Sequence, residues 1–416
     1  MIGTGETAEL ARAWLDETSD GVRGNEKHPE FPGFKRDRGF FSQLVFDDRW
    51  VEQFGRAELA SVLKVRRSRD RFTGAVDLID QKLRLLAQRD YRPEYVVIAM
   101  PKELRSRSGV SNYRDATLGD VHRDLRRAIK AAAMKYGLPT QILSERVTRR
   151  EDEDHPSKIA WNFYTGLYTK AGGVPWAPTG LMPGTCYVGI GFFRPLGTAG
   201  HTLHTSLVQA FDEHGEGLVL RGPDFDWDPD RDGSRSPHLP AEQAAGLVEL
   251  ALSRYQREMK QTPRRVVVHK TSRYWPDERG GFEDVLRARV ARYDLLALEL
   301  QSSVRMITTT KYPPLRGTWF TIGELDFLYT TGFLAALGEY HSMHVPSPLR
   351  LADHVTSDTP RGTLLRETLV LTKLNWNSAS LGGAIPITLR FAGLVGDIMR
   401  EVPRDREPLP QFKFYM

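Results

Sequence analysis

The chain has 416 residues, a formal net charge of +5 and one cysteine, Cys186. This length predicts about two to three domains with a sizeable core. No apolar run approaches the roughly 18 residues that cross a bilayer, and no signal-peptide pattern opens the sequence, so we expect no membrane association. A single cysteine excludes an internal disulfide framework and favours the reducing cytoplasm. The positive charge favours a polyanionic partner.

The first ninety residues predict an irregular segment followed by helices. Residues 1–40 are polar, and the sequence HPEFPGF at 28–34 mixes prolines and a glycine with aromatic residues, which is typical of a docked, irregular lead-in. Residues 48–63 and 74–86 have helical periodicity.

Five cations crowd the short segment that joins these two helical regions. They are Lys64, Arg66, Arg67, Arg69 and Arg71. Such crowding fits contacts with phosphate groups, and it fits a solvated helix end equally well.

The stretch from Asp120 to Gly137 predicts an amphipathic helix between two strands, 95–100 and 141–147. One face of this helix is apolar, while His122, Arg126 and Lys130 follow one another at intervals of four on another face. A row of cations on a helix between two strands either holds a phosphate or forms a solvated surface. A further helix is expected at 159–170.

Beyond the proline- and glycine-rich stretch 172–185, the pattern changes to short strands and then to alternating helices and strands. The predicted strands are 186–194, 202–211, 217–221, 264–269, 295–301 and 304–309, with two more in 319–329. The predicted helices are 242–259, 281–292 and 391–401. Three antiparallel strands followed by alternating helices and strands is the order of an RNase H-like domain.

Several common functional motifs are absent from the sequence. The acidic stretch 223–233 begins like a calcium loop, but Leu239 occupies the position of the bidentate glutamate, so we expect a turn there. The sequence contains neither a Gly-rich phosphate loop nor a nucleophile-elbow serine.

Three segments and the aromatic-rich tail QFKFYM resemble one protein family. The segments are GLYTKAGGVPW (166–176), VVVHKTSRYW (266–275) and LTKLNWNSASLGGAIPITLRFAGLVG (371–396). Together they resemble the Argonaute family, and more narrowly the short prokaryotic Argonautes, which keep only the MID and PIWI domains. The resemblance implies an α/β protein with a Rossmann-like MID domain followed by an RNase H-like PIWI domain. The implied boundaries are 1–90 for a lead-in and helical region packed on the MID domain, 91–177 for the MID domain and 178–416 for the PIWI domain.

The resemblance also implies a pocket for the 5′-phosphate of a guide strand. Arg126, Lys130, Gln141 and Lys170 match the four residues with which this family grips that phosphate, and His122 is an alternative for the first position. Two lysines and a guanidinium group can neutralise a dianionic phosphate. Family members place the C-terminal carboxylate, here that of Met416, beside the same phosphate, so Mg²⁺ is implied as a structural bridge between the two anions. Gly166 stands where some relatives have a glutamine.

The cleavage centre departs from that of active Argonautes, which hold two metal ions with carboxylates. Gly191, Thr271 and Ala392 occupy the positions of three of those acids. Glu213 or Glu216 could imitate the remaining glutamate, but one carboxylate cannot hold a metal pair. The residue types therefore predict a chain that does not cleave its target.

The implied function is guide-directed recognition of nucleic acid in prokaryotic defence against plasmids and phage. The expected guide is RNA and the expected target is single-stranded DNA, read by base pairing. The resemblance also implies a partner subunit that carries an APAZ region and a sirtuin-like, TIR or nuclease effector, with a higher oligomer possible on activation. One alternative is a guided endonuclease with a non-standard acid set. Another, a doubly wound domain for a small phosphorylated metabolite, is disfavoured because the Gly-rich turn is absent.

Overall fold

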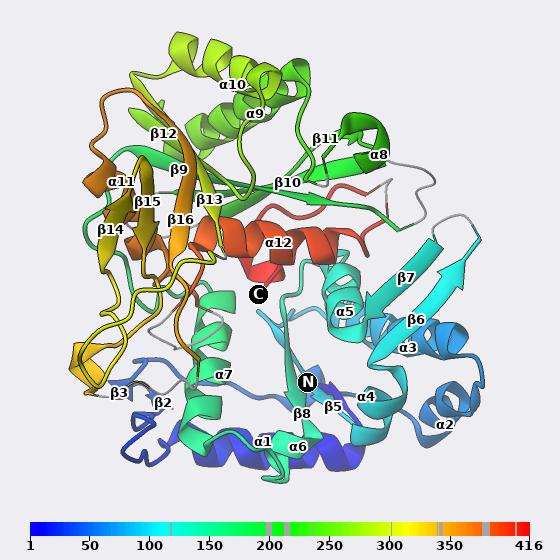
Figure 1. The fold of residues 1–416 in the computed structure, drawn as a ribbon. Helices are drawn as coiled ribbons and strands as arrows, with labels where there is room; N and C mark the ends of the chain where they lie inside the picture. The colour runs from blue at the N-terminus through cyan, green and yellow to red at the C-terminus, as the bar shows by residue number, and fades with distance from the viewer. Residues whose placement is uncertain are drawn as a thin grey trace.

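The structure is a computed structural model, and it describes residues 1–116, 119–196, 202–211, 217–234, 236–300, 302–338, 340, 344–376, 383–403 and 406–416. Two sheets form its framework, a four-stranded sheet in the N-terminal half and an eight-stranded sheet in the C-terminal half (Figure 1). Among the described helices, none is both long and apolar enough to cross a bilayer.

The first sheet is parallel, with the strand order β4-β1-β5-β8. Its strands are β1 Ile2–Gly3, β4 Glu52–Gln53, β5 Val96–Met100 and β8 Thr140–Ser144. Strands from both sides of residue 90 thus belong to one sheet. The boundary predicted at that residue divides this sheet and does not separate a lead-in from it.

Helices cover both faces of the first sheet. They are α1 Gly5–Ser19, α2 Arg56–Lys64, α3 Ser68–Ala87, α4 Lys102–Ser108, α5 Leu125–Met134, α6 Glu145–Thr148 and α7 Pro156–Lys170. Alternate residues of β5 serve the two faces, since Ile98 packs with α3 and α5 while Val97 packs with α1 and α7. This alternation follows from the period of two in a strand that is buried on both sides.

The N-terminal region is more regular than the sequence predicts. Residues 1–40 contain strand β1 and the fifteen-residue helix α1, which the polar composition concealed. Thr4 caps α1 because its side chain accepts a hydrogen bond from the backbone of Thr7. The predicted docking of the 28–34 segment is confirmed, since Phe31 and Phe34 are buried against the ring of Tyr164.

The predicted helix at Asp120 begins later than expected. Residues Gly119–Asp124 form strand β7, which pairs antiparallel with β6, Val110–Asp115. The side chain of Asp124 then caps α5 by accepting a hydrogen bond from the backbone N–H of Arg127, 3.2 Å away. The helical spacing of apolar residues in 121–133 therefore spans a strand and a helix, and a local capping residue marks the change.

The second sheet has the strand order β11-β10-β9-β12-β13-β16-β15-β14. Its strands are β9 Thr185–Phe193, β10 Thr202–Phe211, β11 Gly217–Asp226, β12 Arg265–Lys270, β13 Arg292–Glu299, β14 Trp319–Ile322, β15 Leu325–Leu328 and β16 Leu349–Thr356. Strands β9, β12 and β13 run parallel, and β10 and β11 are antiparallel additions beside β9. This confirms the RNase H-like order that the sequence predicts.

Helices also cover the two faces of the second sheet. They are α8 Pro229–Asp232, α9 Ala241–Met259, α10 Pro276–Arg289, α11 Arg361–Leu371 and α12 Ile387–Met399. Val266 and Val268 pack with α9 and α10, whereas Val267 packs with α11 and α12. One predicted strand is wrong. Residues 304–309 are irregular, and Ile307 is 91% exposed, because this apolar run has no strand beside it.

Candidate guide-phosphate pocket

Helix α5 carries two of the predicted phosphate ligands, Arg126 and Lys130, one turn apart near its N-terminus. Lys130 is buried, whereas Arg126 lies in the first turn with its side chain exposed. His122, the alternative for the first position, lies on β7 and not on the helix. Its ring nitrogen Nδ1 is 2.6 Å from Oδ1 of Asn112 at an exposed position. The structure therefore groups Arg126, and not His122, with Lys130.

The other two predicted ligands come from separate elements and meet. Gln141 lies on strand β8, and Lys170 is the last residue of helix α7. The Nζ atom of Lys170 donates a hydrogen bond to Oε1 of Gln141. Gly166 lies one turn earlier on α7, and a Cβ atom there would lie 3.6 Å from the same oxygen and 3.7 Å from Nζ.

The charges of this cluster are out of balance. Lys130 is 5% exposed and Lys170 is 2% exposed. Burial, followed by the nearby Arg126, lowers the pKa of Lys170 to about 7. Burial, followed by Lys170 and Arg126, lowers the pKa of Lys130 well below its ordinary value. Within the described residues, neither lysine forms an ion pair with a carboxylate, so an incoming anion would supply the missing negative charge.

The cluster opens into a cleft of about 520 Å³ between α5, β8 and α7. Strand β8 is the edge strand of the first sheet, and all five of its residues line the cleft. Arg126, Lys130 and Gln141 line it together with Arg105 of helix α4. Arg105 is not among the residues predicted from the sequence, because no element is predicted between the strand 95–100 and Asp120. Leu104 is the one apolar residue in KELRSR (102–107), so no apolar periodicity indicates α4.

The last residue of the chain is buried between the two halves. Met416 is 1% exposed and shares a hydrophobic cluster with Ala131 and Met134 of α5. Figure 1 shows this end of the chain between α12 and the elements α5, β8 and α7. The C-terminal residue thus lies beside the helix that carries Arg126 and Lys130.

The three positions of the expected cleavage acids lie on neighbouring elements of the second half. In the parallel register Gly189 of β9 pairs with His269 of β12. Gly191 and Thr271 each lie two residues further along, so they lie at the same end of these strands. Helix α12 packs onto both strands there, since Oγ1 of Thr388 is 2.8 Å from Nδ1 of His269. Ala392 follows Thr388 by one helical turn and is buried.

No carboxylate stands at any of these three positions, and the part of the chain that the structure describes contains no group of three or more potential metal-ligating side chains. Glu213 and Glu216 lie outside the described residues. His269 is fully buried, and burial lowers its pKa to about 3, so it is a neutral hydrogen-bonding partner of Thr388 at ordinary pH.

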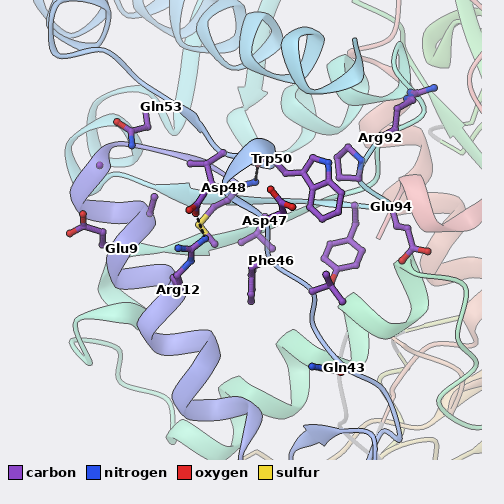
Figure 2. Close-up of a pocket in the computed structure, with 18 residues that line it drawn as sticks. Glu9, Arg12, Gln43, Phe46, Asp47, Asp48, Trp50, Gln53, Arg92 and Glu94 are labelled. Atoms are coloured by element: carbon purple, nitrogen blue, oxygen red, sulfur yellow. Dashed lines mark hydrogen bonds and ion pairs between the residues drawn. The ribbon is translucent and has the colours of Figure 1, made fainter. Parts of the chain in front are cut away.

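A larger cavity of about 710 Å³ lies beside helix α1 and has a different chemistry. Figure 2 shows its aromatic and charged lining, with Phe46 and Trp50 beside the ion pair of Arg12 and Asp48. Its four carboxylates outnumber its two guanidinium groups; these residues are Glu9, Asp47, Asp48, Glu94, Arg12 and Arg92. The smaller cleft at α5 is lined by three cations and three carboxylates, namely Arg105, Arg126, Lys130, Asp124, Asp152 and Asp154. It differs from the larger cavity because one of its cations, Lys130, is buried without a carboxylate partner among the described residues, which suits an anionic ligand.

Comparison with known proteins reveals the class of fold. Neither a protein-family model nor a curated protein matches the sequence. Among solved structures, Clostridium butyricum Argonaute bound to a guide DNA and a 19-mer target DNA matches with a TM-score of 0.64, over 98% of this chain and 49% of that one, at 14% identity. Drosophila Piwi matches with a TM-score of 0.63, over 100% of this chain and 50% of that one, at 14% identity. A. aeolicus Argonaute matches with a TM-score of 0.57, over 99% of this chain and 48% of that one, at 14% identity.

The fold is therefore that of Argonaute and Piwi proteins, as the sequence resemblance predicts. The chain spans about half the length of the structures it matches, which is consistent with the MID–PIWI arrangement of a short Argonaute. From here on, the half built on the first sheet is called the MID half, and the half built on the second sheet is called the PIWI half.

Proposed function

We propose that this protein is a short prokaryotic Argonaute that binds a 5′-phosphorylated guide and uses it to recognise complementary nucleic acid. The observation that carries the proposal is the meeting of Arg126, Lys130, Gln141 and Lys170 from three elements, where the two buried lysines form no ion pair with a carboxylate among the described residues. The Argonaute fold supports nucleic acid as the ligand. The guide is proposed to be RNA and the target single-stranded DNA, with sequence read by base pairing.

The bound phosphate would be held by charge and by directional hydrogen bonds. Arg126 at the cleft mouth would meet the phosphate first, and its planar guanidinium group can bind two oxygens at once. Lys130 and Lys170 would neutralise the charge from inside the cleft, and the Gln141 amide would add a neutral donor. The N-terminus of α5 also favours an anion at this place.

The direct test replaces both buried lysines. We expect Lys130→Ala combined with Lys170→Ala to weaken binding of a 5′-phosphorylated guide by at least about 100-fold, because two charge-assisted hydrogen bonds of about 1.5–3 kcal/mol each are lost. The affinities of 5′-phosphate and 5′-hydroxyl guides should then become similar. Equilibrium binding of both guides to wild type and variant measures this effect. Lys158→Ala on the exposed face of α7 is a matched control, and equal affinity of wild type for the two guides would overturn the pocket.

The magnesium ion and the Met416 carboxylate are part of this proposal. A divalent cation between the guide phosphate and a terminal carboxylate would remove the repulsion of two neighbouring anions. The buried position of Met416 beside α5 supports this arrangement. Addition of EDTA, or extension of the chain beyond Met416, should weaken guide binding, and unchanged affinity in both cases would remove the ion from the proposal.

We further propose that the chain does not cleave its target and instead activates an APAZ-containing effector subunit, through a population shift on target pairing. The residues Gly191, Thr271 and Ala392 support this, since none of them can bind a metal ion through a carboxylate. The alternative is a guided endonuclease. Incubation of the guide-loaded protein with a labelled target and Mg²⁺ or Mn²⁺ distinguishes the two, because defined cleavage products would establish the alternative.

A further inference from the structure

Six exposed cations gather on the MID half at and beside the phosphate cleft. They come from the α2–α3 junction, helix α4 and strand β6, and we call them the basic ridge: Lys64, Arg66, Arg67, Arg105, Arg107 and Arg114. The sequence shows only the first three as one cluster. The fold adds the other three from a segment about forty residues later.

One half-buried side chain, that of Arg71, connects the parts of the ridge by hydrogen bonds. The guanidinium group of Arg71 donates to the carbonyl oxygens of Val65 at 2.7 Å and Arg66 at 3.2 Å, and to that of Arg107 at 2.9 Å. The α2–α3 junction and the end of α4 are therefore close enough for one guanidinium group to bind both. Arg69 extends the same surface towards β6, where its guanidinium carbon lies 4.5 Å from the centre of the Tyr113 ring.

The cations of the ridge are not balanced by neighbouring acids. In the described part of the chain, no member of the ridge forms an ion pair, whereas the adjacent Arg69 pairs with Asp115 at 3.4 Å. Like charges held close together repel one another, which costs stability until a polyanion neutralises them. A nucleic-acid backbone supplies such a series of negative charges.

The ridge continues directly from the phosphate cleft. Arg105 belongs to both, since it also lines the cleft together with Arg126. Figure 1 shows α2, α3 and α4 on the side of the MID half that faces away from the eight-stranded sheet. The opposite side of α5 contacts the PIWI half, where Arg127 pairs with Asp397 at 2.6 Å.

We propose that the basic ridge binds the unpaired 3′ flank of the target strand, beyond the segment that pairs with the guide. This inference rests on the proposed function. A guide that ends in the cleft cannot supply backbone on the far side of its own 5′-phosphate. The target runs antiparallel to the guide, so its 3′ side continues past that phosphate. The pair of the half-buried Tyr113 and the exposed Arg69 next to the ridge offers a surface on which a base of this flank can stack.

The test compares two targets on the guide-loaded protein. One target ends opposite the first guide nucleotide, and the other carries an unrelated 3′ extension of about ten nucleotides, within the range of single-strand binding sites. We expect the extension to increase affinity about tenfold at low salt and to steepen the salt dependence by about 0.7 for each phosphate contacted. The same extension placed at the 5′ end of the target should give no gain.

Arg66→Ala, Arg67→Ala and Arg107→Ala together should abolish the gain and leave guide loading and the shorter target unaffected. A control variant with equal loss of charge, Arg23→Ala, Lys27→Ala and Arg36→Ala at the opposite end of α1, should keep the gain. The proposal is overturned if the extension gives wild type no gain, or if both variants keep it. If the proposed function fails instead, phosphorylation of the guide has no effect on its affinity. The ridge is then still tested with a single strand of the same length in the absence of a guide. The ridge variant should bind this strand more weakly than wild type, whereas the control variant should bind it as wild type does.

Discussion

Lys170 combines a structural contact with an electrostatic cost. Its ammonium group donates to Gln141, yet burial and the neighbouring Arg126 favour the neutral amine. A lysine in water stays charged at neutral pH, because solvent stabilises the ammonium group. A ligand that carries negative charge would stabilise the charged ammonium form of Lys170, and a phosphate dianion is such a ligand.

This situation predicts a pH dependence of guide binding. Without a ligand, Lys170 has a pKa of about 7, and a bound phosphate raises that pKa. Binding should therefore take up a proton between about pH 7 and pH 9, and affinity should fall as pH rises through this range, by at most about tenfold per pH unit for one proton. Calorimetry in buffers of different ionisation enthalpy measures the uptake directly.

A 5′-hydroxyl guide is the control for this pH dependence, since it brings no phosphate charge to the lysine. Lys170→Met should weaken the pH dependence because it removes one of the two buried lysines whose pKa is lowered. A wild-type profile that is flat from pH 7 to pH 9 would contradict the electrostatic account of the pocket.

At the scale of elements, the contact between strand β9 and helix α12 is unusually close. A Cβ atom on Gly189 would lie 2.2 Å from the carbonyl oxygen of Thr388, so the backbone of α12 fills the space of a side chain. This contact fixes the start of α12, and with it the position of Ala392 one turn later. Glycine is required here by the approach of two backbones.

The close approach predicts opposite effects for two glycine substitutions. Gly189→Ala should lower the free energy of unfolding by about 1–3 kcal/mol, because α12 must move away from the sheet. Gly393→Ala lies on the same helix with no atom within 4 Å of the added carbon, so it should raise that free energy by about 0.5–1 kcal/mol through helix propensity. Urea denaturation compares the two, and similar effects at both positions would contradict the packing described for β9.

Some elements of the fold can be predicted from the sequence and others cannot, for physical reasons. Buried strands such as β5 and β12 are visible as apolar runs, and the Lys170 and Lys130 positions follow from their motif. Strand β1 has two residues and is recognisable only by its neighbours β4 and β5. The β7–α5 junction is hidden because Val121 and Leu125 keep a helical spacing across a change of structure. Arg105 joins the cleft through tertiary contact alone, which no spacing in the sequence records.

At the scale of the whole molecule, two ion pairs among the described residues connect the MID and PIWI halves. Arg123 of β7 binds Glu401 through contacts of 2.6 to 3.3 Å, and Glu401 is 4% exposed in its side chain. Arg127 of α5 pairs with Asp397 of α12. Arg126 lies between these two arginines in the sequence and faces the cleft instead. Helix α5, which carries the proposed phosphate ligands Arg126 and Lys130, is therefore also fixed to the PIWI half.

The burial of Glu401 predicts a measurable coupling energy with Arg123. Glu401→Ala should lower the free energy of unfolding by about 2–4 kcal/mol, because it leaves Arg123 half-buried without its partner. A double-mutant cycle with Arg123→Ala should give a coupling of at least about 1 kcal/mol. The exposed pair of Asp154 and Lys158 is the control, with an expected coupling below about 0.5 kcal/mol. A coupling at Glu401 no larger than that of the control would contradict a structural role for this pair.

The position of the C-terminal residues determines whether the MID half and the PIWI half can each fold alone. The backbone N–H of Val219, on the outer strand β11, donates to the carbonyl oxygen of Pro410. Six residues later, Met416 belongs to the same hydrophobic cluster as Ala131 and Met134 of α5. Severing the polypeptide near residue 178 would leave the first fragment with Ala131 and Met134 uncovered, while the second would carry Phe414, Tyr415 and Met416 without a surface to receive them. Two such pieces produced in one cell should re-associate, and each produced alone should tend to aggregate.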